Sequence, residues 1–332
     1  MQPNRPLWMR LTAKLVLGSF IWAQLQIGVD IRRGLVLDIA AAQAGPIADP
    51  AAPIAFRPNV GLSGGGVPVV DITRPNQAGL SHNQYQRFDV DPNGVILNNS
   101  LINGGSLVGG QVGANPNLTG GQPALVILNE ITVSGAPGNL AGTVEVFGSP
   151  ASIIIANPNG LVCNGCGVLN TDRFTLTTGR PAAIDAAGQT VDFGQATRYA
   201  YEVESGRISV LGTGVEGTVG RLDLIGEGLD MRAPLRAHYI NGELCSINLV
   251  AGERRVEEQA DGGYGSLPAT GGGMPAPVQG YAIDASVLGA MTAGQIRILS
   301  TDRGLGVNLA GPLVAHQRDI LVGSAGNANL AR

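Results

Sequence analysis

Short runs in which apolar residues cluster or alternate with polar ones recur along most of the chain. Each run is of strand length and is bounded by glycine, proline or asparagine, the residues that favour turns. Beyond residue 45, helical periodicity is found only weakly, around residues 283–291. The pattern therefore predicts a mostly β protein with strands in VVDIT, FDV, GVILNNS, ALVILNEITV, TVEVF, SIIIA, RFTLTT, RISVLG, RLDLIG, QIRILS and DILVG.

Three of these runs resemble one another: GRISVLG at 206–212, GRLDLIG at 220–226 and GQIRILS at 294–300. Many short strands with irregular repetition are typical of a sandwich or a solenoid. Glycine corners, asparagine at strand ends and low charge favour the solenoid, in which equivalent side chains stack from one turn to the next. Residues 250–280 break the pattern, and we expect them to form a loop that leaves the scaffold.

Composition supports a folded chain and argues against one class of partner. Apolar residues make up 44% and charged residues 14%, whereas disordered chains are poor in apolar residues and rich in charge. Glycine, at 50 of 332 residues, is abundant enough to supply many turns. The net charge is −4 and no basic run is present, which disfavours nucleic-acid binding because that affinity comes from neutralising phosphates.

The start of the chain has the pattern of an export signal. Arg5, Arg10 and Lys14 precede an apolar stretch at residues 15–23, and the small-residue segment AAAQA ends at Ala44. Polar residues interrupt the apolar character, so a buried helix or a membrane anchor is the alternative. An anchor needs about 20 uninterrupted apolar residues, which neither this stretch nor any later one provides.

These features divide the chain into three parts. We expect a signal segment over residues 1–44, with its cleavage site undetermined. An extended leader rich in proline and glycine follows over residues 45–66. Residues 67–332 then form the folded part. The open-ended finish, GSAGNANLAR, indicates a truncated or partial chain, because a finished solenoid normally carries a cap.

Four related proline tetrads punctuate the strands: residues 91–94 (DPNG), 115–118 (NPNL), 157–160 (NPNG) and, more weakly, 74–77 (RPNQ). Asp or Asn first, Pro second and Gly fourth are preferences of type I turns. Proline fixes φ, and the first side chain accepts a hydrogen bond from the backbone two residues on. From the residues alone, these tetrads are predicted to be solenoid corners.

Several motifs then resemble a known family when taken in order from Gly66 to Gly179. GVPVVDITRPN, GANPNLTGG, ALVILNEIT and SPASIIIANPNGLVCNGCGVLNTDRFTLTTG together look like the N-terminal secretion domain of two-partner secretion exoproteins. That family includes filamentous haemagglutinins, haemolysins and contact-dependent growth-inhibition toxins. A weaker resemblance continues through YAIDASVLGAMTAGQIRILSTDRGLGVNLAG. The resemblance implies an all-β fold: a right-handed parallel β-helix (solenoid) with an N-terminal β cap and extra-helical hairpins.

The resemblance also implies a function and a partner. Residues 67–332 would comprise the secretion domain and the β-helix that follows it. A cognate outer-membrane β-barrel transporter with periplasmic POTRA domains would recognise the domain and export the chain from the periplasm of a Gram-negative bacterium to the cell surface or medium. No cofactor or metal is implied. The residues that match the family's secretion motif are Asn115, Pro116, Asn117, Leu118, Asn157, Pro158, Asn159 and Gly160.

Three cysteines leave two interpretations open. Cys163 and Cys166 form a close C-x-x-C pair, and Cys245 stands apart. Export favours a Cys163–Cys166 disulfide across a corner, and free packed thiols are the alternative. A zinc site would need further ligands, and the three histidines (His82, His238 and His316) show no ligand spacing. A redox motif would open a helix, whereas LVCNGCGVLN predicts strand, turn and strand.

Other functions have less support in the sequence. β-Helices also include polysaccharide-degrading enzymes, which use paired carboxylates. The candidates Asp223 and Asp230 show no clustering with basic partners, and the charged residues 253–258 are expected to be solvated in the loop. No nucleophile-elbow, P-loop or zincin motif is present, so no catalytic residue is predicted. The remaining alternative is an adhesin that binds glycans directly through a solenoid face.

Overall fold

The computed structural model describes residues 45–133, 135–238, 245–267, 280–302 and 305–330, so the predicted signal segment lies outside the described residues. Within these ranges almost every element is a strand. The exceptions are three short 3-10 helices: η1 (Ile54–Phe56), η2 (Pro116–Leu118) and η3 (Phe193–Gln195). None of the helices in the described ranges has the length and apolar character needed to cross a membrane.

One side of the fold is a nine-stranded sheet, here called the first sheet. Its strands follow one another in sequence order and pair in parallel, except that β1 (Ile47–Ala48) pairs antiparallel with the strand beside it. The parallel strands are β4 (Leu80–Arg87), β8 (Val126–Ile131), β11 (Ser152–Ala156), β13 (Arg173–Thr177), β18 (Arg221–Gly226), β21 (Ser246–Ala251), β26 (Gln295–Ser300) and β29 (Ile320–Ser324).

The other two sides belong to a single fourteen-stranded sheet. Its long strands β12 (Leu161–Leu169) and β17 (Arg207–Thr218) bend across a corner and pair with different neighbours at their two ends. One column of paired strands, here called a lane, runs through the first parts of β12 and β17. It also contains β9 (Gly138–Leu140), β19 (Gly228–Met231), β24 (Gly280–Ala285), β27 (Leu305–Leu309) and β30 (Ala328–Leu330). A second lane runs through the last parts of β12 and β17. It also contains β3 (Pro68–Asp71), β5 (Val95–Asn99), β10 (Thr143–Gly148), β20 (Leu235–His238), β25 (Met291–Ala293) and β28 (Leu313–Ala315).

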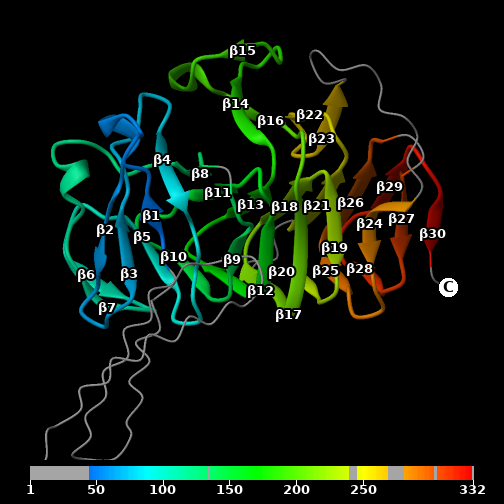
Figure 1. Cartoon of the computed structure of the whole chain (residues 1–332), viewed down its shortest axis with the longest axis horizontal. Helices are drawn as coiled ribbons and strands as arrows, with labels where there is room; N and C mark the ends of the chain where they lie inside the picture. Colours follow the sequence, from blue (N-terminus) through cyan, green and yellow to red (C-terminus); the bar gives the residue numbers. More distant parts are fainter. Residues whose placement is uncertain (1–44, 134, 239–244, 268–279, 303–304, 331–332) are drawn as a thin grey trace, which may run out of the picture. The chain divides into compact units, whose positions relative to one another are not determined.

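The first sheet is the third lane, and each turn of the chain contributes strands to the three lanes. Successive turns follow one another from blue to red in Figure 1. This arrangement is a parallel β-helix, as the sequence predicted. Equivalent apolar side chains stack in register inside it, and each is 0% exposed in the column formed by Ile127, Ile153, Phe174, Leu222, Ile247 and Ile296. Full burial of such a side chain contributes about 1.5–3 kcal/mol, so the stacked interior supplies most of the stability.

Residues 45–66, expected as an extended leader, contain β1, η1 and β2 (Asn59–Leu62). β1 pairs with β4, and β2 pairs antiparallel with β3, so the first edge of each large sheet carries an antiparallel strand. Thr132 Oγ1 also donates to Asp49 Oδ2 (2.7 Å), which ties this segment to the end of β8. These strands correspond to the predicted N-terminal β cap.

Two antiparallel pieces lie outside the β-helix. One is the hairpin of β6 (Gly104–Ser106) and β7 (Gly110–Val112). The other is a five-stranded sheet, here called the accessory sheet, which projects from the helix at the top of Figure 1. It contains β14 (Arg180–Ile184), β15 (Thr190–Val191), β16 (Arg198–Glu202), β22 (Arg255–Glu258) and β23 (Tyr264–Leu267).

One expectation is corrected by these elements. The segment predicted as a loop over 250–280 contains the hairpin of β22 and β23, which pairs with β16 across more than fifty residues of sequence. This error arises because a partner strand far along the chain, and not local sequence, decides the conformation. The weak helical periodicity at 283–291 falls on the end of β24, a turn and the start of β25.

The accessory sheet packs on the outer face of the first sheet. Its apolar residues Tyr199, Tyr201 and Val256 share a buried cluster with Ile154 and Ile225, whose side chains point outward from the β-helix. The first sheet is thus covered on both faces near its middle. This cover creates the buried polar network described below.

Candidate functional site

Three of the predicted proline turns share one geometry. In residues 91–94, 115–118 and 157–160, the third N–H donates to the side-chain Oδ1 of the first residue, at 2.8, 2.9 and 3.0 Å. The fourth N–H donates to the carbonyl of the first, at 2.9, 3.1 and 3.0 Å. In the fourth tetrad, by contrast, the turn begins at Asn76, whose carbonyl accepts from the Gly79 N–H (3.0 Å).

Asn115 is the most deeply bonded member of the first motif turn. It is 2% exposed, and its Nδ2 donates to the carbonyls of Ile72 (3.0 Å) and Asn98 (2.8 Å). Its side-chain oxygen caps η2 by accepting from Asn117. One amide therefore joins the end of β5, the segment after β3 and the turn itself, and alanine would remove a hydrogen bond from each of two backbone carbonyls.

The other residues of this turn divide between the interior and the surface. Leu118 is 0% exposed, whereas Pro116 is exposed. Asn117 Nδ2 donates to the carbonyls of Asp71 and Ile72, both at 3.1 Å. The turn therefore presents its proline outward while leucine and asparagine hold it to the β-helix.

The second motif turn is held by Asn157 and Asn159. Asn157 is 1% exposed, and its N–H donates to Thr177 O (2.9 Å) on the next turn of the helix. Asn159 Nδ2 donates to Val133 O (3.2 Å) on the preceding turn. Gly160 has φ of 107°, and a Cβ there would lie 2.9 Å from Arg207 O, so this corner requires glycine.

The structure does not bring the two motif turns together. Residues 115–118 precede β8, whereas residues 157–160 follow β11 directly, and these two strands pair in parallel. The turns consequently lie at opposite ends of the strands of the first sheet. Each is a rigid corner with a partly exposed proline or asparagine, and neither holds a titratable or metal-ligating side chain.

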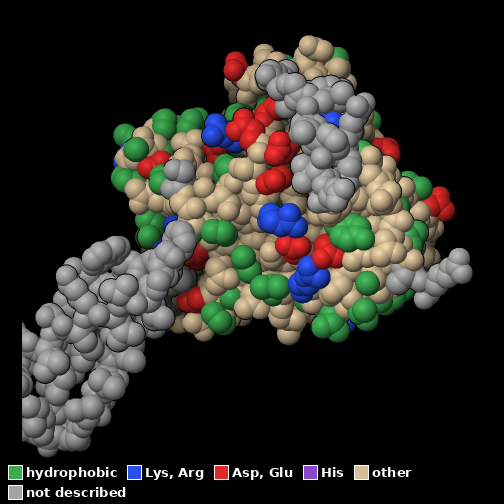
Figure 2. Space-filling model, turned by 45° about the vertical axis from the view of Figure 1, so that its right-hand side comes forward, with side chains coloured by type: hydrophobic (Ala, Val, Ile, Leu, Met, Phe, Trp, Pro, Cys, Tyr) green, Lys and Arg blue, Asp and Glu red, His purple; other side chains and the backbone are tan. Residues whose placement is uncertain are grey.

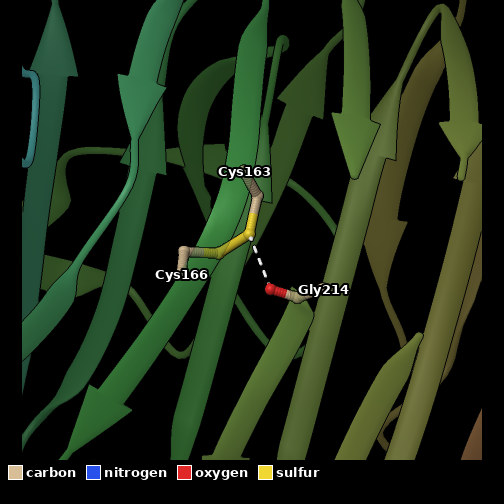
Figure 3. Close-up of a disulfide and its surroundings, with 3 residues drawn as sticks. All are labelled: Cys163, Cys166 and Gly214. Carbon is tan, nitrogen blue, oxygen red and sulfur yellow. Dashed lines mark hydrogen bonds between the residues drawn. A yellow bond between two sulfur atoms is a disulfide. The ribbon is translucent and has the colours of Figure 1, made fainter. Parts of the chain in front are cut away.

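Cys163 and Cys166 are joined by a disulfide, with their Cα atoms 5.3 Å apart (Figure 3). They are 0% and 2% exposed, so the bridge faces the interior. It spans the corner of the bent strand β12, where the pairing with β17 shifts register. Cys163 Sγ lies 3.6 Å from Gly214 O on that neighbouring strand. Cys245 is a buried free thiol.

The remaining candidate groups form no metal site in the described ranges, where no three or more potential ligand side chains cluster. His82 Nε2 lies 2.7 Å from Glu130 Oε2, and its ring contacts Phe56 and Phe193. On the face shown in Figure 2, charged side chains are sparse, and basic groups lie next to acidic ones. Asp230, a carboxylate candidate, pairs with Arg207 (3.1 Å) as a surface ion pair.

A buried ionic network on the outer face of the first sheet corrects two expectations. Arg173 and Arg221 both contact Asp223 Oδ2 (3.1 and 2.9 Å) and Glu258 Oε1 (3.0 and 2.9 Å). The expectation that Asp223 lacks clustered basic partners is therefore wrong, as is the expectation that residue 258 is solvated, since Glu258 is 8% exposed. The first error follows from the unrecognised pairing of β13 with β18, which stacks Arg173 on Arg221, and the second from the unrecognised hairpin that carries Glu258 onto the sheet.

Electrostatics in this network keep Asp223 charged and Tyr264 neutral. Burial alone raises the pKa of Asp223, but the guanidiniums of Arg221 and Arg173 outweigh it and hold this pKa below its usual value. Burial raises the pKa of Tyr264, which therefore stays protonated and donates to Asp223 Oδ2 (2.7 Å). Asp223, held in this way, helps to fasten the accessory sheet through Tyr264 and is not free for acid–base chemistry.

Comparison with known proteins identifies a family and several relatives of this chain. A family model described as the TPS secretion domain matches residues 44–330. The 16S rRNA endonuclease CdiA of Enterobacter cloacae is 40% identical over 268 residues, covering 80% of this chain and 7% of that protein. Filamentous hemagglutinin of Bordetella pertussis is 37% identical over 273 residues, with 80% and 7% covered. The hemolysin of Serratia marcescens is 40% identical over 263 residues, with 78% and 15% covered.

A solved structure gives the same result in three dimensions. The crystal structure of a filamentous hemagglutinin secretion domain superposes with a TM-score of 0.68 at 33% identity, covering 87% of this chain and 100% of that one. The chain spans a small part of the length of the curated relatives, 7% of the first and 15% of the hemolysin. The activities in the names of those relatives are accordingly properties of much longer proteins.

Proposed function

We propose a function from one premise: this chain belongs to the family of TPS (two-partner secretion) secretion domains. It directs its own export across an outer membrane by binding a cognate transporter, a β-barrel with periplasmic POTRA domains. The observation that carries the proposal is the family match over residues 44–330, within which both asparagine-proline turns of the predicted motif are present.

Physical chemistry supports a route for such export. A chain with 14% charged residues and strand-forming runs throughout can present extended segments to the sheet edges of a transporter while it is unfolded. Once outside, each new turn of chain stacks on the previous one and buries a further layer of apolar side chains. Burial of this kind favours the folded exterior state and thereby biases threading outward.

The proposed route places the protein at the cell surface or in the medium of a Gram-negative bacterium, reached through the periplasm. Relatives named as a hemagglutinin, a hemolysin and CdiA nucleases support a role in a larger adhesin or toxin-delivery protein. In that role the domain described here binds the transporter and then folds outside the cell, and it performs no reaction of its own.

The test is export of a double variant, Asn115→Ala with Asn157→Ala, by the cognate transporter in a reconstituted Gram-negative host. We expect secreted protein to fall severely, because each substitution removes the side-chain oxygen that organises its turn. Asp91→Ala is the matched control, since Asp91 makes the same turn bond outside the motif and is more exposed.

Two results decide the outcome. If the double variant is exported as well as Asp91→Ala, the two motif turns serve only as corners of the β-helix. They would then no longer support the proposal. Circular dichroism of the purified variants measures how far the lost hydrogen bonds, three of them at Asn115, destabilise the fold, and so separates lost recognition from lost folding.

A further inference from the structure

The third cysteine, Cys245, is accommodated in the folded protein as a free thiol. It is 8% exposed, its Sγ–H donates to Ala237 O (3.2 Å), and its sulfur accepts from the Gly294 N–H (3.0 Å). Ala237 lies on β20, which is separated by β17 from β12 with its Cys163–Cys166 bridge. Two strand spacings are about 9.5 Å, whereas a disulfide requires Cα atoms within about 7 Å. The fold therefore holds Cys245 apart from the bridged pair.

The Cys163–Cys166 bridge is enclosed by the fold. Its two cysteines are 0% and 2% exposed, in the corner of β12 that lies against β17 (Figure 3). A protein disulfide forms when a cysteine thiolate attacks a sulfur of another disulfide, so an oxidant must reach the thiols. A corner that is covered to this extent admits no protein oxidant, and buried structural thiols are inert. Closure of the bridge by such an oxidant therefore precedes the stacking of β12 and β17.

The proposed export route provides one stage at which an oxidant and accessible thiols coincide. In the periplasm the chain is still unfolded, so its cysteines are exposed to solvent. Thiol–disulfide oxidoreductases keep that compartment oxidising. Outside the cell the chain folds and covers the same cysteines. The bridge is accordingly assigned to the unfolded chain in the periplasm, before it enters the transporter.

Ring size decides which thiols pair in the unfolded chain. Cys163 and Cys166 are separated by 3 positions in sequence, whereas a ring closed between Cys163 and Cys245 would contain roughly 80 residues. The entropy of loop closure favours the short ring about a hundredfold. The short ring is also no wider than a β-turn, because its Cα atoms are 5.3 Å apart, so it can travel within an extended chain. The long ring would force the transporter to hold two strands of chain side by side.

We propose that a periplasmic thiol–disulfide oxidoreductase closes the Cys163–Cys166 bridge on the unfolded chain, and that early closure keeps Cys245 single so that the chain can pass the transporter. One cysteine thiolate attacks a sulfur of the oxidoreductase disulfide, which forms a mixed disulfide and releases one oxidoreductase thiolate. The second cysteine thiolate attacks the chain's sulfur in the mixed disulfide, which closes the ring and releases the other oxidoreductase thiolate. The chain loses two electrons and two thiol protons, and the oxidoreductase becomes a dithiol. This inference rests on the proposed function, because that function requires the chain to be threaded.

The first test measures transporter-dependent export of three variants: Cys166→Ser, Cys163→Ser with Cys166→Ser, and Cys166→Ser with Cys245→Ser. We expect Cys166→Ser alone to lower the amount of secreted protein about tenfold or more, because Cys163 then pairs with Cys245 in the periplasm. Each double variant retains a single cysteine, so no ring can form, and export should stay within about twofold of the wild type. Non-reducing electrophoresis after alkylation should show the long ring only in periplasmic Cys166→Ser.

The double variants separate mispairing from simple loss of the bridge. Cys163→Ser with Cys166→Ser lacks the bridge as completely as Cys166→Ser does, but it cannot form the long ring. If this double variant is exported as poorly as Cys166→Ser, the bridge acts through the stability of the fold and the inference is overturned. Export of Cys166→Ser at the wild-type level, with no long ring in the periplasm, would overturn it as well.

The stage of closure is tested on the wild type in a host that lacks its periplasmic thiol oxidoreductase. Secreted chain is denatured, alkylated and analysed by mass spectrometry. We expect alkylation of Cys163, Cys166 and Cys245 in this host, and of Cys245 alone in the parent host. Fully bridged secreted chain from the deficient host would overturn the inference and leave the proposed function standing. If bridged wild type instead stays in the periplasm although the transporter is present, the proposed function fails, and the threading role of the bridge fails with it.

Discussion

Replacing Asp223 by asparagine should destabilise the folded chain far more than any surface ion-pair substitution. Asp223 is 0% exposed and contacts both Arg173 and Arg221. The substitution is nearly isosteric, so packing is preserved, but the charge is lost and one accepting oxygen becomes an NH2 donor that faces other donors. Glu258 would then be the single carboxylate opposing two guanidiniums that are only 12% and 16% exposed.

The magnitude follows from this burial. Breaking a buried ion pair from one side costs about 3–5 kcal/mol, because the remaining charge stays desolvated and loses its partner. Asp284 gives the contrast, since its pair with Arg232 (2.6 Å) joins side chains that are 23% and 44% exposed. Solvent screening leaves such a pair worth roughly 0–1 kcal/mol. The two substitutions therefore differ by at least about 2 kcal/mol.

Urea unfolding followed by circular dichroism measures the difference. With a slope of about 3 kcal/mol per M, Asp223→Asn should lower the midpoint by about 1–1.7 M, and Asp284→Asn by no more than about 0.3 M. Equal midpoints for the two variants would refute the reasoning, because they would show that the cover provided by β22 and β23 does not desolvate the network.

The pH dependence of the free energy of unfolding provides a second test, made on wild type and Asp223→Asn. The folded-state pKa of Asp223 lies below its usual value despite burial, owing to Arg221 and Arg173. Its stabilising effect is therefore complete above the unfolded pKa of about 3.9 and is lost as pH falls further. The gap in stability between wild type and Asp223→Asn should be constant from pH 7 to about 5 and should narrow below about 4. A gap that widens in acid would contradict the assignment.

Three further predictions address the core, the disulfide and the carboxylate of Glu130. Leu222→Ala in the stacked column should cost about 2–5 kcal/mol in urea unfolding, and a loss below about 1 kcal/mol would mean that the column is loosely packed. Serine at both Cys163 and Cys166 should cost about 2 kcal/mol, the chain entropy of a four-residue loop, and reductant should lower the calorimetric melting temperature of the wild type but not of this variant. Burial alone raises the pKa of Glu130, but its bonds to His82 hold it below the usual value, so stability should fall below about pH 4.3 and Glu130→Gln should show a flatter acid limb in thermal melts.

Local chemistry made part of this architecture predictable from the sequence. The turn at residues 157–160 depends on bonds between residues two and three apart, and the φ of Gly160 is one that glycine tolerates best. The turn and its place at a corner of the β-helix could therefore be predicted from the four residues of the tetrad alone. The strands RFTLTT and RLDLIG were predicted for the same reason, since their inward residues alternate with outward ones.

Contacts between distant segments made the rest unpredictable. Arg173 meets Glu258 across 85 residues, and the strand that carries Glu258 has a sequence as polar as a solvated loop. One signal was present nevertheless: Arg173 and Arg221 occupy the first position of two successive strands, with Thr175 and Asp223 two residues later. In a stacked fold that spacing places Asp223 between two arginines, because one residue has neighbours both along its strand and across it.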